Sequence, residues 1–273
     1  MDSRTLIDHT GRDVKVPLNP ERIVSFSPAV TEILFELGLG SNIVGVSAFC
    51  QRPREVAGIR RVGSYGSART EVLDAVNPDL ILAISGYQKD FAMKLSERYP
   101  VFIFELPSSV AGILDLVSRV GIVTGRVDES KYMNFELMKY LGSIRRHPAL
   151  TGYLEIDLGG PVTFGSMSYI TDALSLMGVN SIYRKTDSEW VKPDLDFVME
   201  SDPDVIFYEP KMYGRFDNAM QQKLIKERKW ENMSAVTLGR FFVTPGKLDF
   251  FAHHGPAFIR EVIPWTMEKL DDL

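Results

Sequence analysis

The sequence predicts an α/β protein of two doubly wound parallel-sheet lobes, joined by one long rigid helix, with a ligand cleft between the lobes. Short apolar strands alternate with helices on either side of a middle region that lacks strand signals. Apolar strands alternating with helices are typical of parallel sheets covered on both faces. A unit of helix, Pro-Asp, strand and tyrosine also occurs twice, at 72–87 and 197–213. The 273 residues suit one large domain or two smaller ones.

The first half predicts a sheet with its helices. Ser27-Pro28 favours a helix start, a face spaced by three and four residues follows, and Gly38 or Gly40 favours its end. Glu71 lies in the first turn of a second, short helix at 69–76. The strands are expected at 22–27, 42–47, 79–84 and 101–106.

The middle of the chain predicts two helices. The first spans 108–125 and ends at a glycine. The second spans 128–146, is about 28 Å long at 1.5 Å per residue, and has acidic residues first and arginines last, as the helix dipole favours. We therefore expect an N-terminal α/β lobe over 1–107, a helical segment with the interlobe helix over 108–149, and a C-terminal α/β lobe over 150–273.

Strand signals resume in the second half. Strands are expected at 152–159, 204–209 and 241–245. Helices are expected at 169–178, 195–201 and 218–227, with a last one in 255–270.

Composition and motifs exclude several functions. The net charge of −5 argues against a nucleic-acid partner, and the single cysteine, Cys50, excludes an intrachain disulfide. No stretch approaches the 18–20 apolar residues or so of a membrane span. The N-terminus does not resemble a signal peptide, so we expect either a cytoplasmic protein or a mature form whose leader a start Met replaces. The nucleophile elbow, Walker A, Cys-x-x-Cys and His-Glu-x-x-His motifs are missing, so we do not expect an enzyme.

The repeated unit predicts where a ligand binds. Ligands of open parallel sheets bind beyond the carboxyl ends of the strands. Tyr87 and Tyr213 follow such strands in the two lobes. The alternative is that the repeat is simply how doubly wound sheets are encoded, with both tyrosines as ordinary loop residues.

A family resemblance covers most of the chain. Its pieces are "GRDVKVP", "NPERIVSFSPAVTEILFELGL", "VGVS", "NPDLILA", "TGR" and "DFFAHHGPAFIREVI". Their order and spacing resemble the class III periplasmic substrate-binding proteins of ABC importers, which carry cobalamin or ferric siderophores. "VGVSAFCQRPREVAGIRRVGSYG" is most similar to the cobalamin-binding branch. Two departures are His253-His254 where the family often has Arg-Pro, and Ile84 where that branch often has tryptophan.

The resemblance implies a carrier without an intrinsic cofactor. It implies that the protein captures cobalamin and delivers it to a permease with its ATPase, outside the cytoplasm and with a possible membrane anchor. Alternatives are a ferric-siderophore or haem carrier of the same family, or a cytoplasmic chelatase-like tetrapyrrole enzyme or chaperone.

A flat macrocyclic ligand favours rigid aromatic walls and a few polar groups. In the first lobe, the resemblance implies the wall Ser27, Phe49, Tyr65, Gly86 and Tyr87. In the second lobe, it implies Ser166, Met167, Trp190, Tyr208, Glu209, Tyr213, Phe250, His253 and His254. Trp190 has the alternative of a helix-entry contact, and Met167 that of a core residue.

The adjacent His253 and His254 are candidate ligands of a chelated metal. An imidazole from this pair could approach an axial position of cobalt or iron. The alternative is a solvent-exposed loop pair without a ligand. Four histidines in the chain are too few for a typical closed site for a bare metal ion.

The resemblance also implies that each lobe offers an acidic residue to arginines of the permease. By position these are Asp90 in the first lobe and Asp217 in the second. The alternative is that both are ordinary surface carboxylates.

Overall fold

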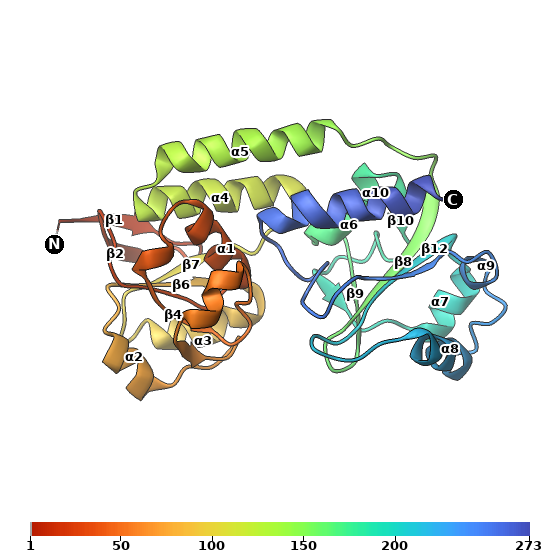
Figure 1. Cartoon of the computed structure of the whole chain (residues 1–273), viewed down its shortest axis with the longest axis horizontal. Coiled ribbons are helices and arrows are strands. Elements are labelled where there is room, and N and C mark those ends of the chain that lie inside the picture. The colour runs from red at the N-terminus through yellow and green to blue at the C-terminus, as the bar shows by residue number, and fades with distance from the viewer. Residues whose placement is uncertain (1) are drawn as a thin grey trace. The chain divides into compact units, whose positions relative to one another are not determined.

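The computed structural model describes residues 2–273, and the chain divides into two compact units (Figure 1). Unit 1 runs to Pro107 and includes Ala111–Lys139, and unit 2 comprises Ser108–Val110 and Tyr140–Leu273. Each unit contains its own sheet and its own hydrophobic core. The expected α/β class is confirmed.

Unit 1 is built on a five-stranded parallel sheet with the order β5-β4-β3-β6-β7. The strands are β3 (Ile23–Ser25), β4 (Ile43–Ser47), β5 (Arg61–Gly63), β6 (Leu80–Ile84) and β7 (Val101–Phe104). The helices between them are α1 (Pro28–Glu36), α2 (Thr70–Val76) and α3 (Lys89–Leu95). Strands β3, β6 and β7 are buried along their whole length, which explains why they read as continuous apolar runs.

A hairpin precedes this sheet, and the sequence analysis missed it. Strands β1 (Ser3–Ile7) and β2 (Asp13–Pro17) pair antiparallel. The Asp8 carboxylate accepts hydrogen bonds from Thr10 and Arg12 and so closes the turn. The His9 N–H donates to the Ile103 carbonyl at 3.0 Å, which attaches the hairpin to β7.

Two helices occupy the middle of the chain, α4 (Val110–Thr124) and α5 (Val127–Gly142). They pack side by side, since the Asn134 amide donates to the Leu114 carbonyl and the Ser118 hydroxyl. The expectation that the second helix reaches residue 146 is wrong. It ends at Gly142, where the Ser143 hydroxyl donates to the Tyr140 carbonyl at 2.7 Å and occupies an acceptor of the last turn.

Unit 2 contains a six-stranded sheet that is parallel in part. Strands β10, β8, β12 and β13 are parallel, while β9 and β11 extend the sheet antiparallel beside β8. The strands are β8 (Leu150–Asp157), β9 (Pro161–Phe164), β10 (Val179–Ser181), β11 (Trp190–Val191), β12 (Val205–Glu209) and β13 (Phe241–Val243). Strand β9 was not expected from the sequence; it follows a tight turn in which the Asp157 carboxylate accepts the N–H groups of Gly159 and Gly160.

Five helices accompany this sheet in the described chain. They are α6 (Tyr169–Leu176), α7 (Leu195–Ser201), α8 (Asn218–Glu227), α9 (Ser234–Thr237) and α10 (Ile263–Asp271), the last preceded by a π-helical turn at Phe258–Val262. No helix within residues 2–273 combines the length and apolarity needed to cross a membrane.

The repeated Pro-Asp motif has a structural role in both units. Asp79, directly before β6, accepts the N–H groups of Glu21 and Arg22 before β3. Asp204, before β12, accepts the N–H and hydroxyl of Thr151 in β8, each at 2.7 Å. In each unit this aspartate joins the amino ends of two neighbouring parallel strands.

Candidate functional site

Three aromatic side chains form a row at the carboxyl ends of β4, β5 and β6 in unit 1. The ring centroids of Phe49 and Tyr65 lie 6.0 Å apart, edge to face, and those of Tyr65 and Tyr87 lie 6.2 Å apart, stacked. Phe49 is 40% exposed and Tyr87 is 81% exposed. The structure therefore brings together three residues that the sequence placed on one wall. We call Phe49, Tyr65 and Tyr87 the aromatic row.

Gly86 and Gly66 shape the backbone around the row. Gly86 has φ +71, a left-handed conformation that glycine adopts without strain, and it precedes Tyr87 in a short helical turn. A Cβ at Gly66 would lie 3.1 Å from the Tyr87 ring. The Tyr87 ring thus lies close over the Gly66 backbone.

Gln88 holds the loops of the row together, and the sequence analysis missed it. Its buried amide donates to the carbonyls of Phe26 and Tyr65, at 3.0 and 2.9 Å, and its carbonyl accepts the Ile84 N–H. One side chain thereby links the ends of β3 and β6 to the loop after β5. The signal in the sequence was a glutamine directly after Tyr87.

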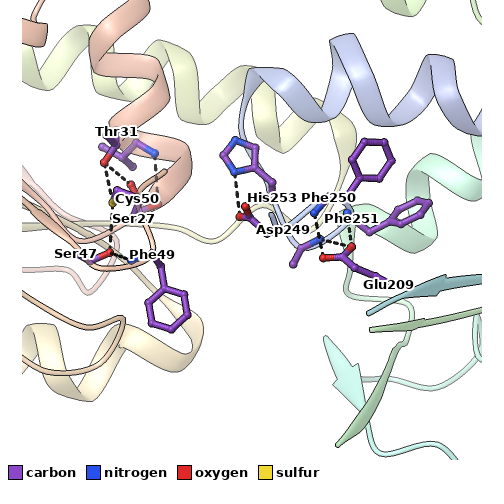
Figure 2. Close-up of polar contacts among 12 residues, drawn as sticks. Ser27, Thr31, Ser47, Phe49, Cys50, Glu209, Asp249, Phe250, Phe251 and His253 are labelled. Carbon is purple, nitrogen blue, oxygen red and sulfur yellow. Dashed lines mark hydrogen bonds and ion pairs between the residues drawn. The ribbon is translucent and has the colours of Figure 1, made fainter. Parts of the chain in front are cut away.

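Ser27 lies inside unit 1 rather than on this exposed row. Its hydroxyl accepts the Val30 N–H at 3.4 Å and so begins α1. Around it, the Thr31 hydroxyl donates to the Ser25 hydroxyl. It also donates to the Cys50 sulfur, and the Ser47 hydroxyl lies 3.3 Å from that sulfur (Figure 2). These groups are fully buried, and burial raises the pKa of the Cys50 thiol. The cluster is linked to the row through Ser47, whose hydroxyl accepts the Phe49 N–H at 3.3 Å.

In unit 2, Ser166, Met167 and Trp190 are exposed. The N–H groups of Ser166 and Met167 donate to the carbonyls of Thr186 and Ser188, which joins the loop after β9 to the loop before β11. Trp190 pairs with Phe164 as part of β11 and is 58% exposed. Trp190 is therefore a strand residue, and Met167 is not a core residue.

Tyr208 and Phe250, which the resemblance put on the wall of the second lobe, are buried in the structure. Every residue of β12 is buried, and the Tyr208 ring packs 5.0 Å from Phe216. Phe250 packs 5.3 Å from Trp265. A strand covered on both faces has no solvent side for an aromatic residue to occupy.

Glu209 is buried and organises the loop that contains Phe250. Its carboxylate accepts the N–H groups of Phe250, Phe251 and Ala252, at 3.0, 2.5 and 3.4 Å (Figure 2). Burial raises the pKa of Glu209 to about 7, although the bonds from Phe250 and Phe251 act in the opposite direction. Glu209 thus anchors the loop from within.

The two histidines are buried, so the alternative of a solvent-exposed pair is wrong. His253 Nδ1 lies 3.3 Å from an Asp249 carboxylate oxygen (Figure 2). Burial, with His253 nearby, lowers the pKa of His254 to about 3, so its imidazole is neutral. Residues 2–273 contain no group of three or more His, Cys, Asp or Glu side chains arranged to hold a metal ion.

Tyr213 is exposed beside a basic pocket that sequence analysis missed. Its backbone has φ +61, and its N–H donates to the Lys247 carbonyl at 2.8 Å. The pocket measures about 120 Å³ and is lined by Lys211, Arg215 and Lys247 among others. A signal was present, because Lys211 and Lys247 each follow a predicted strand by a few residues.

The two expected docking carboxylates differ in their surroundings. Asp90 is exposed in the first turn of α3. Asp217 is the N-cap of α8, where its carboxylate accepts the Met220 N–H at 3.0 Å, and the Arg215 side chain lies 3.5 Å from the same carboxylate. Asp217 therefore has a local structural role, which neither the docking interpretation nor the alternative of an ordinary surface carboxylate predicted.

Comparisons with known proteins agree with this architecture. A vitamin B12-binding protein of Photorhabdus laumondii is 22% identical over 192 residues, covering 68% of this chain and 70% of the relative. An uncharacterised ABC transporter substrate-binding lipoprotein of Bacillus subtilis is 23% identical over 94% of this chain and 82% of its own length. A solved structure of a possible iron-binding, periplasmic solute-binding protein from Staphylococcus epidermidis superposes with a TM-score of 0.76 at 23% identity, over 92% of this chain and 99% of that one.

The family itself is shown by a match that spans most of the chain. The family model described as periplasmic binding protein matches residues 23–248. Its members are non-enzymatic transport components, and membership implies a periplasmic or extracellular location and an ABC permease as partner. The resemblance drawn from the sequence is confirmed: the chain belongs to the periplasmic binding protein family, as a substrate-binding component of the ABC-transporter type.

Proposed function

We propose that this protein captures cobalamin or a closely related corrinoid and delivers it to an ABC permease with its ATPase. The observation that carries the proposal is the aromatic row of Phe49, Tyr65 and Tyr87, set on the carboxyl ends of three parallel strands. Exposed rings on a rigid sheet suit the face of a flat macrocycle. The Photorhabdus relative, named as a vitamin B12-binding protein, supports the choice of corrinoid.

Unit 2 has exposed candidates of its own for ligand binding. Ser166, Met167, Trp190 and Tyr213 all lie on loops or on the short strand β11. We infer no axial metal ligand from His253 or His254, because both imidazoles are buried. In this proposal the histidines support the loop and do not contact cobalt.

A titration tests the proposal. Purified protein is titrated with cyanocobalamin, and with haem and ferrichrome in parallel, following tryptophan fluorescence and the visible spectrum. We expect binding of cyanocobalamin at micromolar concentration or tighter. Binding of haem or ferrichrome without binding of cyanocobalamin would assign the protein to the haem or siderophore carriers of its family. No detectable binding of any of the three ligands would overturn the proposal.

Tyr87→Ala is the sharpest single change in the row. Loss of one stacked ring should weaken ligand binding about fivefold, because an aromatic contact contributes roughly 1 kcal/mol. Tyr132→Ala is the matched control, since Tyr132 is a similarly exposed tyrosine of unit 1 on α5. Equal affinities of the two variants would exclude Tyr87 from the ligand site.

We also propose that Asp90 contacts an arginine of the permease. The exposed position of Asp90 at the start of α3 supports this role, whereas the capping role of Asp217 makes it the weaker candidate. Asp90→Lys should keep the ligand affinity of the isolated protein and lower uptake in cells, because it places like charges at the docking contact. Unchanged uptake would remove Asp90 from the interface.

The lipoprotein relative supports a membrane-anchored form.

A further inference from the structure

We propose that the basic pocket of unit 2 is a subsite for an oxyanion, a phosphate or carboxylate group at the edge of the transported ligand. The statement about the transported ligand rests on the proposed function, whereas the anion site itself does not. Lys211, Arg215 and Lys247 line the pocket, which measures about 120 Å³, the size of a small polar group and its nearest waters.

The pocket is positively charged, although the protein as a whole is negatively charged. The chain carries a net charge of −5, yet every charged residue lining the pocket is basic. Arg215 is partly neutralised, because Asp217 lies 3.5 Å away. Lys211 and Lys247 have no carboxylate within ion-pair distance among residues 2–273. Two like charges around one cavity repel each other, and an anion between them would relieve that repulsion.

The position of the pocket is that of a ligand site rather than of a random surface patch. Strands β12 and β13 are parallel neighbours, with Tyr208 opposite Val243, and the two lysines lie on the loops that follow them. Val243 and Thr244 line the pocket at the carboxyl end of β13. The carboxyl ends of parallel strands are where ligands of such sheets bind.

The backbone around the lysines is fixed by hydrogen bonds. The Tyr213 N–H donates to the Lys247 carbonyl, and the Gly214 N–H donates to the Lys211 carbonyl, each at 2.8 Å. The first bond joins the two loops, so their lysines are held on one cavity. It also places exposed Tyr213 beside the pocket, where its ring can contact the apolar body of a ligand whose anionic group the lysines bind.

Lysines at this site favour oxyanions as a class. An ammonium group donates three hydrogen bonds and accepts none, and its bonds to phosphate or carboxylate are about twice as strong as neutral ones. A phosphodiester, as in the nucleotide loop of cobalamin, and a carboxylate, as in the propionates of haem, present the same chemistry. The experiment below separates these two sources.

The test uses the double variant Lys211→Gln/Lys247→Gln and a matched control, Lys223→Gln/Lys226→Gln. The control removes the same charge from exposed lysines on α8 of the same unit. The backbone bonds of Lys211 and Lys247 use main-chain atoms only, so the variant is expected to keep the loop structure.

The first arm titrates the isotope-labelled protein with inorganic phosphate and follows the amide signals of Gly214 and Gly246, two glycines of the pocket. We expect saturable shifts at concentrations on the order of 1 mM in the wild type and the control, and at least about tenfold weaker binding in the double variant. Absent shifts, or equal shifts in the two variants, would overturn the anion site whatever the carrier function.

The second arm compares ligand pairs that differ by one anionic function. Cyanocobalamin is compared with dicyanocobinamide, which lacks the phosphodiester, and haem with its dimethyl ester. Of the pair that the protein binds, only the anionic ligand should bind the double variant about tenfold more weakly than the wild type. This loss of affinity should be larger at an ionic strength of about 0.01 M than at about 1 M, because salt screens the lysine charges. If the protein binds phosphate but none of the four chelates, the anion site is supported and the proposed function is overturned. If the double variant loses the same affinity for both ligands of a pair, the pocket is not a subsite for the transported ligand.

Discussion

At the scale of single residues, the same residue types serve two different purposes in this protein. Tyr87, in the turn after β6, and Trp190, the first residue of β11, are exposed, while Tyr208 and Phe250 fill the interior of unit 2. For the two tyrosines near β12, position relative to the end of the strand decides which purpose applies. Tyr208 lies within β12 and is buried, and Tyr213, five residues later, lies beyond its carboxyl end and is exposed.

Two buried ionisable groups predict opposite effects of pH on stability. The pKa of Glu209 is raised from 4.5 to about 7, so its contribution to stability is present at low pH and lost as pH rises through about 7. The pKa of His254 is lowered from 6.5 to about 3, so its contribution is present above pH 6.5 and lost as pH falls toward about 3. Between about pH 4.5 and 6.5 the two contributions oppose each other in the wild type.

Glu209→Gln should therefore expose the histidine contribution. The free energy of unfolding of the variant, minus that of the wild type, should increase from pH 4.5 to 7 by on the order of 3 kcal/mol, at about 1.4 kcal/mol per pKa unit. Urea unfolding across this pH range measures the difference. Glu231→Gln, an exposed glutamate of the same unit, is the charge-matched control. A difference that is independent of pH would contradict the assignment of a raised pKa to Glu209.

At the scale of elements, the two sheets use one device to align their parallel strands. Asp79 and Asp204 each follow a proline, and the residues before the prolines, Asn77 and Asp202, have left-handed backbones that end α2 and α7. The helix thus ends, the chain turns, and the aspartate binds the start of the neighbouring strand. The repeat in the sequence is a repeat of this connection.

Asp204→Ala tests the connection in unit 2. The change removes two hydrogen bonds at 2.7 Å to Thr151 and should cost about 1 to 2 kcal/mol of unfolding free energy. Asp187→Ala, an exposed loop aspartate of the same unit, should cost much less. Urea unfolding followed by tryptophan fluorescence compares them, and equal midpoints would mean that the Asp204 contacts do not contribute to the alignment of β8 and β12.

At the scale of the whole molecule, each unit carries its own reporter of unfolding. All three tryptophans, Trp190, Trp230 and Trp265, belong to unit 2, and the single cysteine, Cys50, belongs to unit 1. Cys50 is fully buried, and burial raises its pKa, so its thiol should react slowly in the folded protein. Fluorescence and thiol labelling therefore observe different units.

These reporters test whether the units unfold separately. Because each unit has its own core, Asp204→Ala should lower the urea midpoint measured by tryptophan fluorescence and leave the midpoint of Cys50 labelling unchanged. Asp79→Ala, the equivalent change in unit 1, is the reciprocal control and should affect Cys50 labelling alone. Equal shifts of both midpoints in either variant would show that the two units unfold as one cooperative body.

By itself, the sequence determined the α/β class, most of the helices and parallel strands, and the loops beyond the strands. These features have local signals, namely apolar runs, Pro-Asp turns and glycines at helix ends. The family resemblance put Phe49, Tyr65 and Tyr87 on one wall, and the structure brings the three rings together because the ends of parallel strands meet at one edge. Tertiary structure alone decided which predicted wall residues are buried, because burial depends on what covers a strand. It also decided that Lys211 and Lys247, 36 positions apart in the sequence, line one pocket, because β12 and β13 pair side by side.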